Sequence, residues 1–299
     1  MKDILDQHYL MWVILSVILG LVFPKIAILL PLSEFLLATM VFSIVLNIEA
    51  EHLLSVSPKS IAIIFTIQFL MPLLGFAIAL LLGLHPYLII GFALIGAVTP
   101  EFVAPVQTRL AGGNVALAVL VLILSAILGM GFIPLIIKLL GIQTTFNPWN
   151  LGFEILKLIT IPMILSFLIR RLAGKKTYQY STVFTNVAII CVLLLIAIAS
   201  AENASFIIEE RILIPKLVVG ALTLNSLGYG IGYVSGKLMQ KEDRIASVFS
   251  IGMRDFAVAA TLVFSVNLPS ISALPAVIYG IVEMISSTAL LKFFYVNHS

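Results

Sequence analysis

Ionisable side chains lie inside two of the long apolar runs of this chain. Glu101 stands near the middle of the run at about 87–109, and Arg254 and Asp255 are adjacent at a similar depth in the run at about 243–267. A charge at the centre of a bilayer costs about 2.5 to 3.5 kcal/mol on insertion scales, so such residues usually belong to ion or substrate pathways. The two stretches therefore predict an ion and substrate site inside a membrane.

Helix-breaking residues interrupt the first of these stretches. Gly96, Pro100 and Pro105 lie within ten residues of one another, and each proline removes a backbone donor and disfavours a helical conformation before it. Two broken helices that meet at mid-membrane would direct their N-termini toward anions and their C-terminal carbonyls toward cations. The alternative interpretation is that the same ionisable residues form a buried ion pair that only fixes helix packing.

Other polar residues inside apolar runs are weaker candidates, because many such residues only bond neighbouring helices. This group consists of Glu34, Gln68, Asn225 and Glu283. Lys157 follows Glu154 by three positions, which is as consistent with a helical i, i+3 ion pair near the outer surface as with a site residue.

Enzymatic sites find little support. The four histidines lie in loops or near the ends of apolar runs, so the chain contains neither a zinc-binding H-E-x-x-H helix nor a Ser and His pair at one depth. Glu101 and Asp255 could form a proton-sharing dyad, but Arg254 beside Asp255 argues against it. We therefore expect no enzyme, no cofactor and no firm metal site, although Na+ or H+ could serve as a coupling ion near Glu101 and Asp255.

The composition indicates that membrane-spanning helices position these residues. Of the 299 residues, 61% are hydrophobic and 10% are charged, and the mean hydropathy is +1.18, whereas soluble domains carry about 25% charged residues. A run of about 20 apolar residues can cross a bilayer as a helix. We predict an all-α polytopic protein with the lipid bilayer as its partner and ten spans, at about 9–23, 26–47, 59–83, 87–109, 114–140, 149–171, 181–200, 212–237, 243–267 and 272–294.

Basic residues predict the orientation of these spans. Eleven of them fall on the side of the N-terminus, and only Lys25, Lys138, Arg211 and Lys216 fall on the other. The positive-inside rule then places both termini in the cytoplasm and the chain in the cell membrane, plasma or inner, as a multi-pass protein. Because the basic residues are scattered over loops, no nucleic-acid partner is expected.

Short similarities between the two halves predict an internal repeat. One glycine spacing recurs after 153 positions, in Gly75 with Gly83 and in Gly228 with Gly236, and a shift of 154 lays residues 101–102 over 255–256. Because five spans is an odd number, two such halves must enter the membrane in opposite senses, which is typical of secondary transporters. We predict one transmembrane domain, 1–299, with inverted repeats at about 9–140 and 149–294.

Several motifs resemble the bile acid:sodium symporter family, in the right order over about residues 10–295. TRLAGGNVALAV (108–119) is close to the family's TYLA-x-GN-VALSV, and IGMRDFAVA (251–259) is similar to VGMQNSGLA; further matches are ILKLITIPMIL (155–165) and LNSLGYGIGY (224–233). The resemblance implies ten helices, of which 3–5 and 8–10 form a core and 1, 2, 6 and 7 a panel, with helices 4 and 9 broken and crossed. It also implies alternating-access transport of a small organic anion.

The chain departs from the family at its sodium sites. The resemblance assigns two sodium ions to a T-A-S-N stretch, to hydroxyls of the fifth helix and to E-V-G-M-Q-N. The corresponding residues here are Val103-Ala104-Pro105, Ala118, Leu122, Ser250, Arg254 and Asp255. Most of the side-chain oxygens that sodium prefers are therefore missing, although Gln68, Met253 and backbone carbonyls could contribute.

These departures lead to a specific hypothesis, in which the Arg254 guanidinium occupies a former sodium position as a tethered cation, balanced by Asp255 or Glu101. Transport would then be sodium-independent, or coupled to protons through Glu101. The alternatives are sodium held by carbonyls with Glu101 and Asp255, or an efflux carrier or channel on the same fold. The predicted site comprises Thr99, Glu101, Gln107, Asn225, Arg254 and Asp255, with Gln68, Ser250, Met253 and Glu283 as additional candidates.

Overall fold

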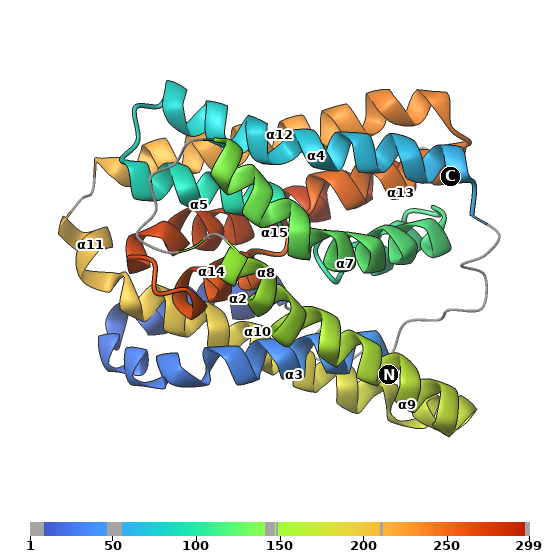
Figure 1. Cartoon of the computed structure of the whole chain (residues 1–299), viewed down its shortest axis with the longest axis horizontal. Helices are drawn as coiled ribbons and strands as arrows, with labels where there is room; N and C mark the ends of the chain where they lie inside the picture. The colour runs from blue at the N-terminus through green and yellow to red at the C-terminus, as the bar shows by residue number, and fades with distance from the viewer. Residues whose placement is uncertain (1–8, 47–55, 141–146, 148, 210–211, 297–299) are drawn as a thin grey trace.

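The computed structural model describes residues 9–46, 56–140, 147, 149–209 and 212–296, and every element within them is a helix (Figure 1). The first half contains α2 (Tyr9–Val22), η1 (Pro24–Leu32), α3 (Ser33–Leu46), α4 (Pro58–Leu81), α5 (Pro86–Ala97), α6 (Ala104–Leu110) and α7 (Val115–Leu139). The second half contains α8 (Trp149–Ile155), η3 (Leu156–Thr160), α9 (Ile161–Ala173), η4 (Gly174–Tyr180), α10 (Ser181–Glu202), α11 (Ala204–Glu209), α12 (Leu213–Ser235), η5 (Gly236–Leu238), α13 (Lys241–Gly252), α14 (Phe256–Ser265), η6 (Ser270–Ala273) and α15 (Leu274–Val296).

By length and composition, seven helices among the described residues could cross a membrane, which confirms a polytopic helical protein. Three of the predicted apolar runs form shorter apolar helices instead, at Met11–Val22, Pro86–Ala97 and Phe256–Ser265. The second and third of these are short because the runs are interrupted, between α5 and α6 and between α13 and α14. The structure thus has both of the expected breaks.

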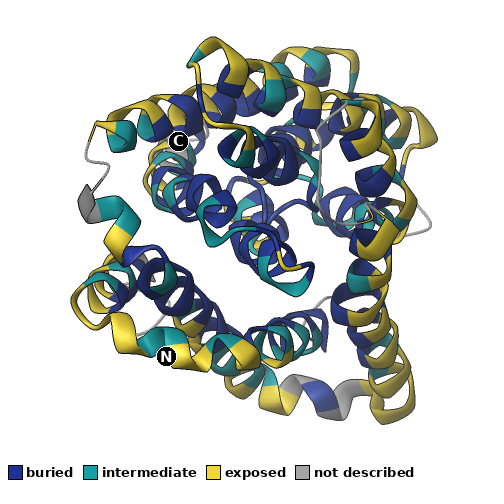
Figure 2. Ribbon diagram, turned by 60° about the vertical axis from the view of Figure 1, so that its left-hand side comes forward, coloured by how far each residue is buried: buried dark blue, intermediate teal, exposed yellow. Residues whose placement is uncertain are grey.

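The helices pack as two groups, and α7, α14 and α15 make the main contacts between them. In one group α10 packs against α2, α3 and η1, and α3 packs against α9; in the other α4 packs against α5 and α12, and α12 against α13 and α15. α7 contacts α8, and α14 contacts both α3 and α10, so these helices connect the groups. Buried residues face the interior of each group and exposed residues the outside, as Figure 2 shows.

Glycines allow the central helices of the second group to approach one another closely. A Cβ at Gly75 would lie 2.2 Å from the Phe92 carbonyl oxygen of α5, and a Cβ at Gly228 would lie 2.9 Å from the Gly252 Cα atom of α13. Each of these two glycines thus touches the helix that follows it in the chain, α5 or α13, but at residues that the shift does not superimpose. The other two differ, because Gly83 has a φ of +62° and open space around it, whereas a Cβ at Gly236 would collide with Arg244.

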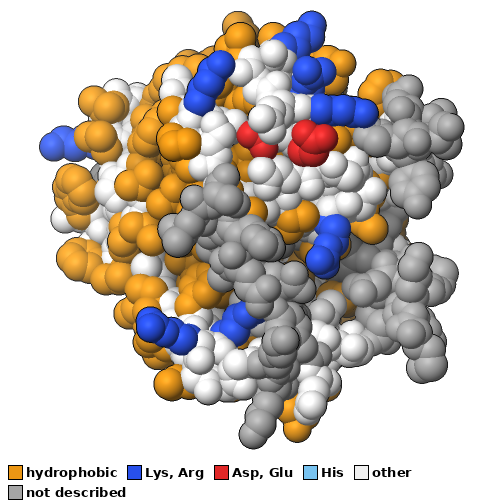
Figure 3. All heavy atoms as spheres, turned by 90° about the vertical axis from the view of Figure 1, so that its right-hand side faces the viewer, with side chains coloured by type: hydrophobic (Ala, Val, Ile, Leu, Met, Phe, Trp, Pro, Cys, Tyr) orange, Lys and Arg blue, Asp and Glu red, His pale blue; other side chains and the backbone are white. Residues whose placement is uncertain are grey.

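Basic side chains gather at one end of the molecule. Figure 3 shows the end at which α4 and α13 begin and α9 ends, with Lys and Arg side chains near acidic ones and apolar surface beside them. Lys59, Arg170 and Arg171 belong to these helix ends, and all were assigned to the cytoplasmic side from the sequence. That assignment also used Lys2 and Arg211, and it placed both chain termini in the cytoplasm. Lys2, Arg211 and both termini lie outside the described residues.

Candidate functional site

The two breaks pair with each other as a short antiparallel bridge. Pro100 lies opposite Arg254, the Glu101 N–H donates to the Met253 carbonyl at 3.2 Å, and the Asp255 N–H donates to the Thr99 carbonyl at 3.1 Å. A shift of 154 positions exchanges these two hydrogen bonds with one another. α6 contacts α13 and α5 contacts α14, so the half-helices on each side of the bridge also pack together.

Different local signals produce the two breaks. α5 ends at Val98, whose extended backbone (φ −64°, ψ 169°) leads into Pro100, and Pro105 lies in the first turn of α6. The second break contains no proline. There Met253 is extended and Asp255 is the N-cap of α14, accepting the Val258 N–H at 2.8 Å, which matches the strong N-cap preference of aspartate.

The Arg254 guanidinium lies among the carbonyl ends of both interrupted helices. Its Nη1 donates to the Val98 carbonyl at 3.2 Å and to Oε1 of Gln68, and its Nε donates to the Ile251 carbonyl at 3.1 Å. Val98 caps α5 and Ile251 lies in the last turn of α13. The C-terminus of a helix carries partial negative charge, so this position favours a cation.

Three buried carboxyl groups surround the bridge. Glu283 of α15 accepts the backbone N–H of Arg254 at 2.7 Å, and Glu101 and Asp255 stand in the bridge itself. One oxygen of each group, Glu101 Oε2, Asp255 Oδ2 and Glu283 Oε1, is buried without a hydrogen-bond partner. These oxygens are free to bind a cation, a proton or a donor on the cargo.

The structure does not contain the ion pair of the alternative interpretation. Within the described part of the chain, the guanidinium hydrogen bonds of Arg254 go to two carbonyls and one amide oxygen, and no ion pair joins it to Asp255 or Glu101. Asp255 instead caps a helix. The two adjacent charges point to different partners because they lie on an extended segment, where successive side chains point to opposite sides.

A network on α12 and α15 holds the end of α13. Asn225 Nδ2 donates to the Gly252 carbonyl at 3.0 Å, and the Tyr279 hydroxyl donates to the same carbonyl at 2.6 Å. The Ser286 hydroxyl donates to Asn225 Oδ1 at 2.6 Å. The sequence analysis missed Tyr279 and Ser286, which nothing in the local sequence distinguishes from ordinary residues of an apolar helix.

The remaining predicted site residues divide into two sets. Gln68 donates to the Ser250 carbonyl at 2.9 Å, and Met253 and Thr99 provide the carbonyls of the bridge, so these residues lie at the crossing. Gln107 lies on α6, beyond the break, and no described contact links it to the other site residues. Its side-chain oxygen is buried without a partner.

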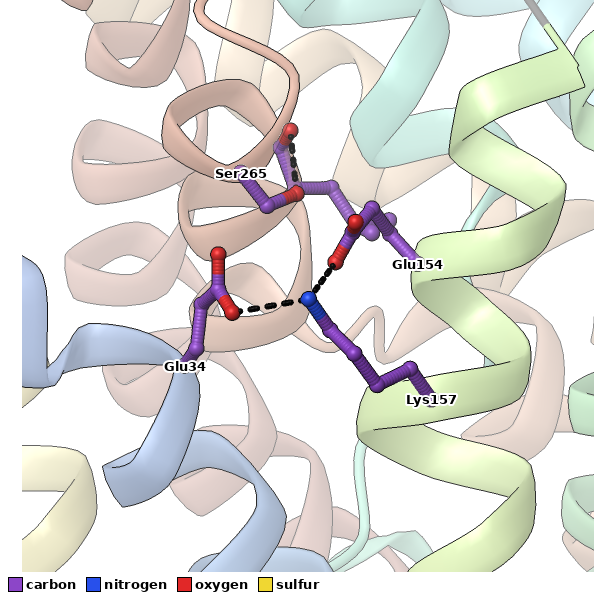
Figure 4. A network of polar contacts seen from close by, with 5 residues as sticks. Glu34, Glu154, Lys157 and Ser265 are labelled. Atoms are coloured by element: carbon purple, nitrogen blue, oxygen red, sulfur yellow. Dashed lines mark hydrogen bonds and ion pairs between the residues drawn. The ribbon is translucent and has the colours of Figure 1, made fainter.

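A second polar cluster lies apart from the crossing, at the junction of the two helix groups. Figure 4 shows Lys157 between Glu34 of α3 and Glu154 of α8, close to Ser265 at the end of α14. The Lys157 Nζ atom is 2.9 Å from Glu34 and 2.8 Å from Glu154. The expected i, i+3 pair with Glu154 is therefore present, and it is extended to a second helix.

Metal-binding side chains do not form a cluster in the described residues. No group of three or more His, Cys, Asp or Glu residues there could hold a metal ion, so the three carboxyl groups are not gathered at one point. A sodium ion at the crossing would need backbone carbonyls and hydroxyls in addition to one or two of the carboxylates.

The chain is similar to known proteins over most of its length. A family model described as the sodium bile acid symporter family matches residues 34–210. The chain is 25% identical over 293 residues to a Bacillus subtilis (strain 168) protein named uncharacterized sodium-dependent transporter YocS, covering 95% of this chain and 89% of that protein.

Plant proteins are similar over shorter shares of their length. The chain is 28% identical over 209 residues to the probable sodium/metabolite cotransporter BASS1, chloroplastic, of Oryza sativa subsp. japonica, covering 69% of this chain and 51% of that protein. It is 24% identical over 299 residues to the BASS2 protein of the same plant, covering 97% of this chain and 71% of that protein. The chain thus spans about half the length of the rice BASS1 protein.

Proposed function

The chain belongs to the sodium bile acid symporter family, and from this membership we propose that it moves a small organic anion across the cell membrane by alternating access. It is a membrane transporter and not an enzyme, as its family and relatives are. We further propose that its ten helices form an inverted repeat and that Arg254 takes part in ion coupling. The cargo is handled where α5, α6, α13 and α14 meet.

The symmetry of the bridge supports an inverted repeat. The Glu101–Met253 and Asp255–Thr99 hydrogen bonds exchange under the 154-residue shift, and Gly75 and Gly228 each closely contact the helix that follows in the chain. Inverted repeats that meet at broken helices near mid-membrane are a recurring architecture of alternating access. We therefore treat residues 9–140 and 149–294 as the two repeats, with the core and panel helices as the resemblance implies.

One observation carries the coupling proposal: the Arg254 guanidinium lies at the carbonyl ends of both half-helices. There it donates to Val98 and Ile251 and to the Gln68 side chain. A guanidinium is always charged in proteins, so it supplies at this point the positive charge that a bound cation would bring. We propose that it acts as a tethered cation and makes transport sodium-independent.

Sodium coupling is the second candidate, and two observations favour it. The Bacillus relative is named a sodium-dependent transporter, and the buried Thr99 hydroxyl has no partner, like the free oxygens of Glu101 and Asp255. In this version, sodium binds these oxygens and the bridge carbonyls beside Arg254. Proton coupling through Glu101 is the third, and it uses the same unpartnered carboxylate.

Thermal unfolding of the purified protein in sodium and in choline, at constant ionic strength, separates these candidates. Binding to the folded state stabilises it by RT ln(1 + [L]/Kd), about 2.7 kcal/mol at a hundredfold excess over Kd. We expect the wild-type melting temperature to be the same in both salts, and Arg254→Ala to lower it and to create a dependence on sodium. Arg171→Ala, on the exposed end of α9, is the control.

Two outcomes would contradict the tethered cation. Saturable stabilisation of the wild type by sodium would establish the second candidate, and an Arg254→Ala variant that stays indifferent to every cation would show that the site has no cation-binding character. Indifference to sodium with melting that depends strongly on pH would favour proton coupling. Accumulation of cargo against its gradient in proteoliposomes would then separate a transporter from a channel, because a channel cannot concentrate its cargo.

A further inference from the structure

A small cavity lies between α4 and α7, on the side of α5 where that helix ends. Its lining includes Gln68, Phe69, Val98, Ser125, Gly129 and Phe132. It has room for a head group of a few atoms and not for a whole cargo molecule. It is therefore a site for part of a ligand whose remainder lies elsewhere.

The cavity faces the bilayer. Among the described helices the main neighbours of α4 are α5, α7, α12 and α13, and no helix of the first group is one of these main neighbours. The exposed stripe of α4 is apolar, with Phe69, Leu70 and Leu73 at its centre, and Leu128 at the cavity rim is also exposed. A ligand that reaches this cavity directly comes from lipid, so its exposed part must be apolar.

The inner wall of the cavity is polar and touches the Arg254 guanidinium. Arg254 Nη1 donates to the Val98 carbonyl and to Gln68 Oε1, and both residues line the cavity. The Ser125 hydroxyl is buried there without a hydrogen-bond partner. The charged group directly behind the wall is thus a cation, and a hydroxyl donor stands free beside it, which favours an anionic acceptor.

Two aromatic rings flank the opening. The Phe69 and Phe132 rings stand edge to face, with 4.3 Å between their centroids and an interplanar angle of 73°. Together with Leu128 they form an apolar rim around a polar base. This combination matches an amphiphile with a narrow chain and an anionic end.

We propose that this cavity binds the carboxylate head of a single-chain lipid, which enters from the bilayer between α4 and α7. The carboxylate accepts a hydrogen bond from the Ser125 hydroxyl and competes with Gln68 Oε1 for Arg254 Nη1, while the chain leaves the cavity beside the contacting Phe69 and Phe132 rings, over Leu128, into the membrane. The cavity adjoins the cargo crossing, with which it shares Gln68 and Val98, and the lipid proposal does not specify which ion couples transport. Occupancy would weaken the Arg254–Gln68 hydrogen bond and so link lipid binding to the crossing.

Photo-crosslinking tests the site on the full chain in nanodiscs. The probe is dodecanoate with a diazirine on its chain, and the labelled residues are mapped by mass spectrometry. We expect labels on α4 and α7 around Phe69 and Phe132 that excess dodecanoate removes and excess dodecanol does not. Ser125→Ala should weaken the labelling about two- to thirteenfold, because the loss of one hydrogen bond is worth about 0.5 to 1.5 kcal/mol.

Two glycines of α7 provide a matched pair of variants. A Cβ at Gly129 would have only Ile133 Cδ1 nearby, at 3.7 Å, and a Cβ at Gly131 would have no atom within 4 Å. Both positions therefore have room for a Cβ atom, but only Gly129 lines the cavity. Gly129→Leu should abolish the labelling, and Gly131→Leu should leave it unchanged.

Several results would overturn the proposal. These are equal labelling of the two glycine variants, or equal competition by dodecanol and dodecanoate, which would indicate an ordinary annular lipid. Because labelling needs no gradient and no cargo, it is independent of the uptake assay. A failure of the lipid site and a failure of the transport proposal can therefore be told apart.

Discussion

Asp255 has two separable roles at the crossing, because one carboxylate oxygen caps α14 and the other has no partner. The capping oxygen accepts the Val258 N–H, a contact that asparagine reproduces. The second oxygen is free, and only a carboxylate can use it to hold a cation or a proton. The two roles respond differently to substitution.

We expect Asp255→Ala to lower the free energy of unfolding by about 1 kcal/mol more than Asp255→Asn does, because alanine removes the N-cap and asparagine keeps it. Uptake should fall in both variants if the free oxygen takes part in transport. Thermal unfolding and proteoliposome uptake, measured on both variants, provide the check. Equal stability of the alanine and asparagine variants would show that the cap contributes nothing.

At the scale of elements, Asp243 ties the ends of three helices together. Its Oδ2 accepts the Ser60 hydroxyl of α4 at 2.5 Å, and its Oδ1 accepts the Asn114 side-chain amide at 2.8 Å. Asn114 in turn caps α7 by accepting the Leu117 N–H. Asp243 itself lies in the first turn of α13, where its negative charge interacts favourably with the positive end of the helix dipole.

Asp243→Ala should therefore destabilise the protein by about 3 kcal/mol. The substitution removes two hydrogen bonds to a charged group, and each is worth about 1.5 kcal/mol at the lower end of the usual range. Glu242→Ala is the matched control, because Glu242 is the exposed neighbour in the same turn. Thermal unfolding measures both. Similar losses in the two variants would mean that only the helix dipole matters.

The close contact of α12 with α13 depends on a glycine in α12. A Cβ at Gly228 would collide with Gly252, whereas a Cβ at Gly230 would meet no atom within 4 Å. Gly228→Ala should lower stability by about 1 to 3 kcal/mol through overpacking, and Gly230→Ala should leave it equal or higher by about 0.5 to 1 kcal/mol. Melting temperatures that do not separate the two variants would contradict this packing.

At the scale of the whole molecule, the basic end in Figure 3 predicts an orientation in the membrane. With Cys191, the single cysteine of the chain, replaced by alanine, one new cysteine can report each side. We expect an impermeant maleimide to label Lys25→Cys in intact cells and Glu242→Cys only after permeabilisation, because the positive-inside rule places the basic end in the cytoplasm. The reverse pattern would invert the topology.

Local patterns in the amino-acid sequence are enough to predict the helical class, the positions of the apolar runs, both breaks and the ionisable residues at them. These features depend on local properties: hydropathy over about 20 residues decides whether a helix can cross a membrane, proline ends the helix at the first break, and the N-cap preference of Asp255 favours a new helix start at the second. The family motifs in the two halves added the relation between the fourth and ninth runs. Glu101, Arg254 and Asp255 were therefore identifiable before the structure.

The groups that these residues contact could not be predicted in this way and are set by the packing of the helices. Arg254 bonds to Gln68 and Val98, which are more than 150 positions away in the chain, and not to its neighbour Asp255. Tyr279 joins the crossing, and Gln107 stays outside it. A side chain takes the partners that the packing of distant helices brings within about 3 Å, and a single sequence does not encode that packing in any local pattern.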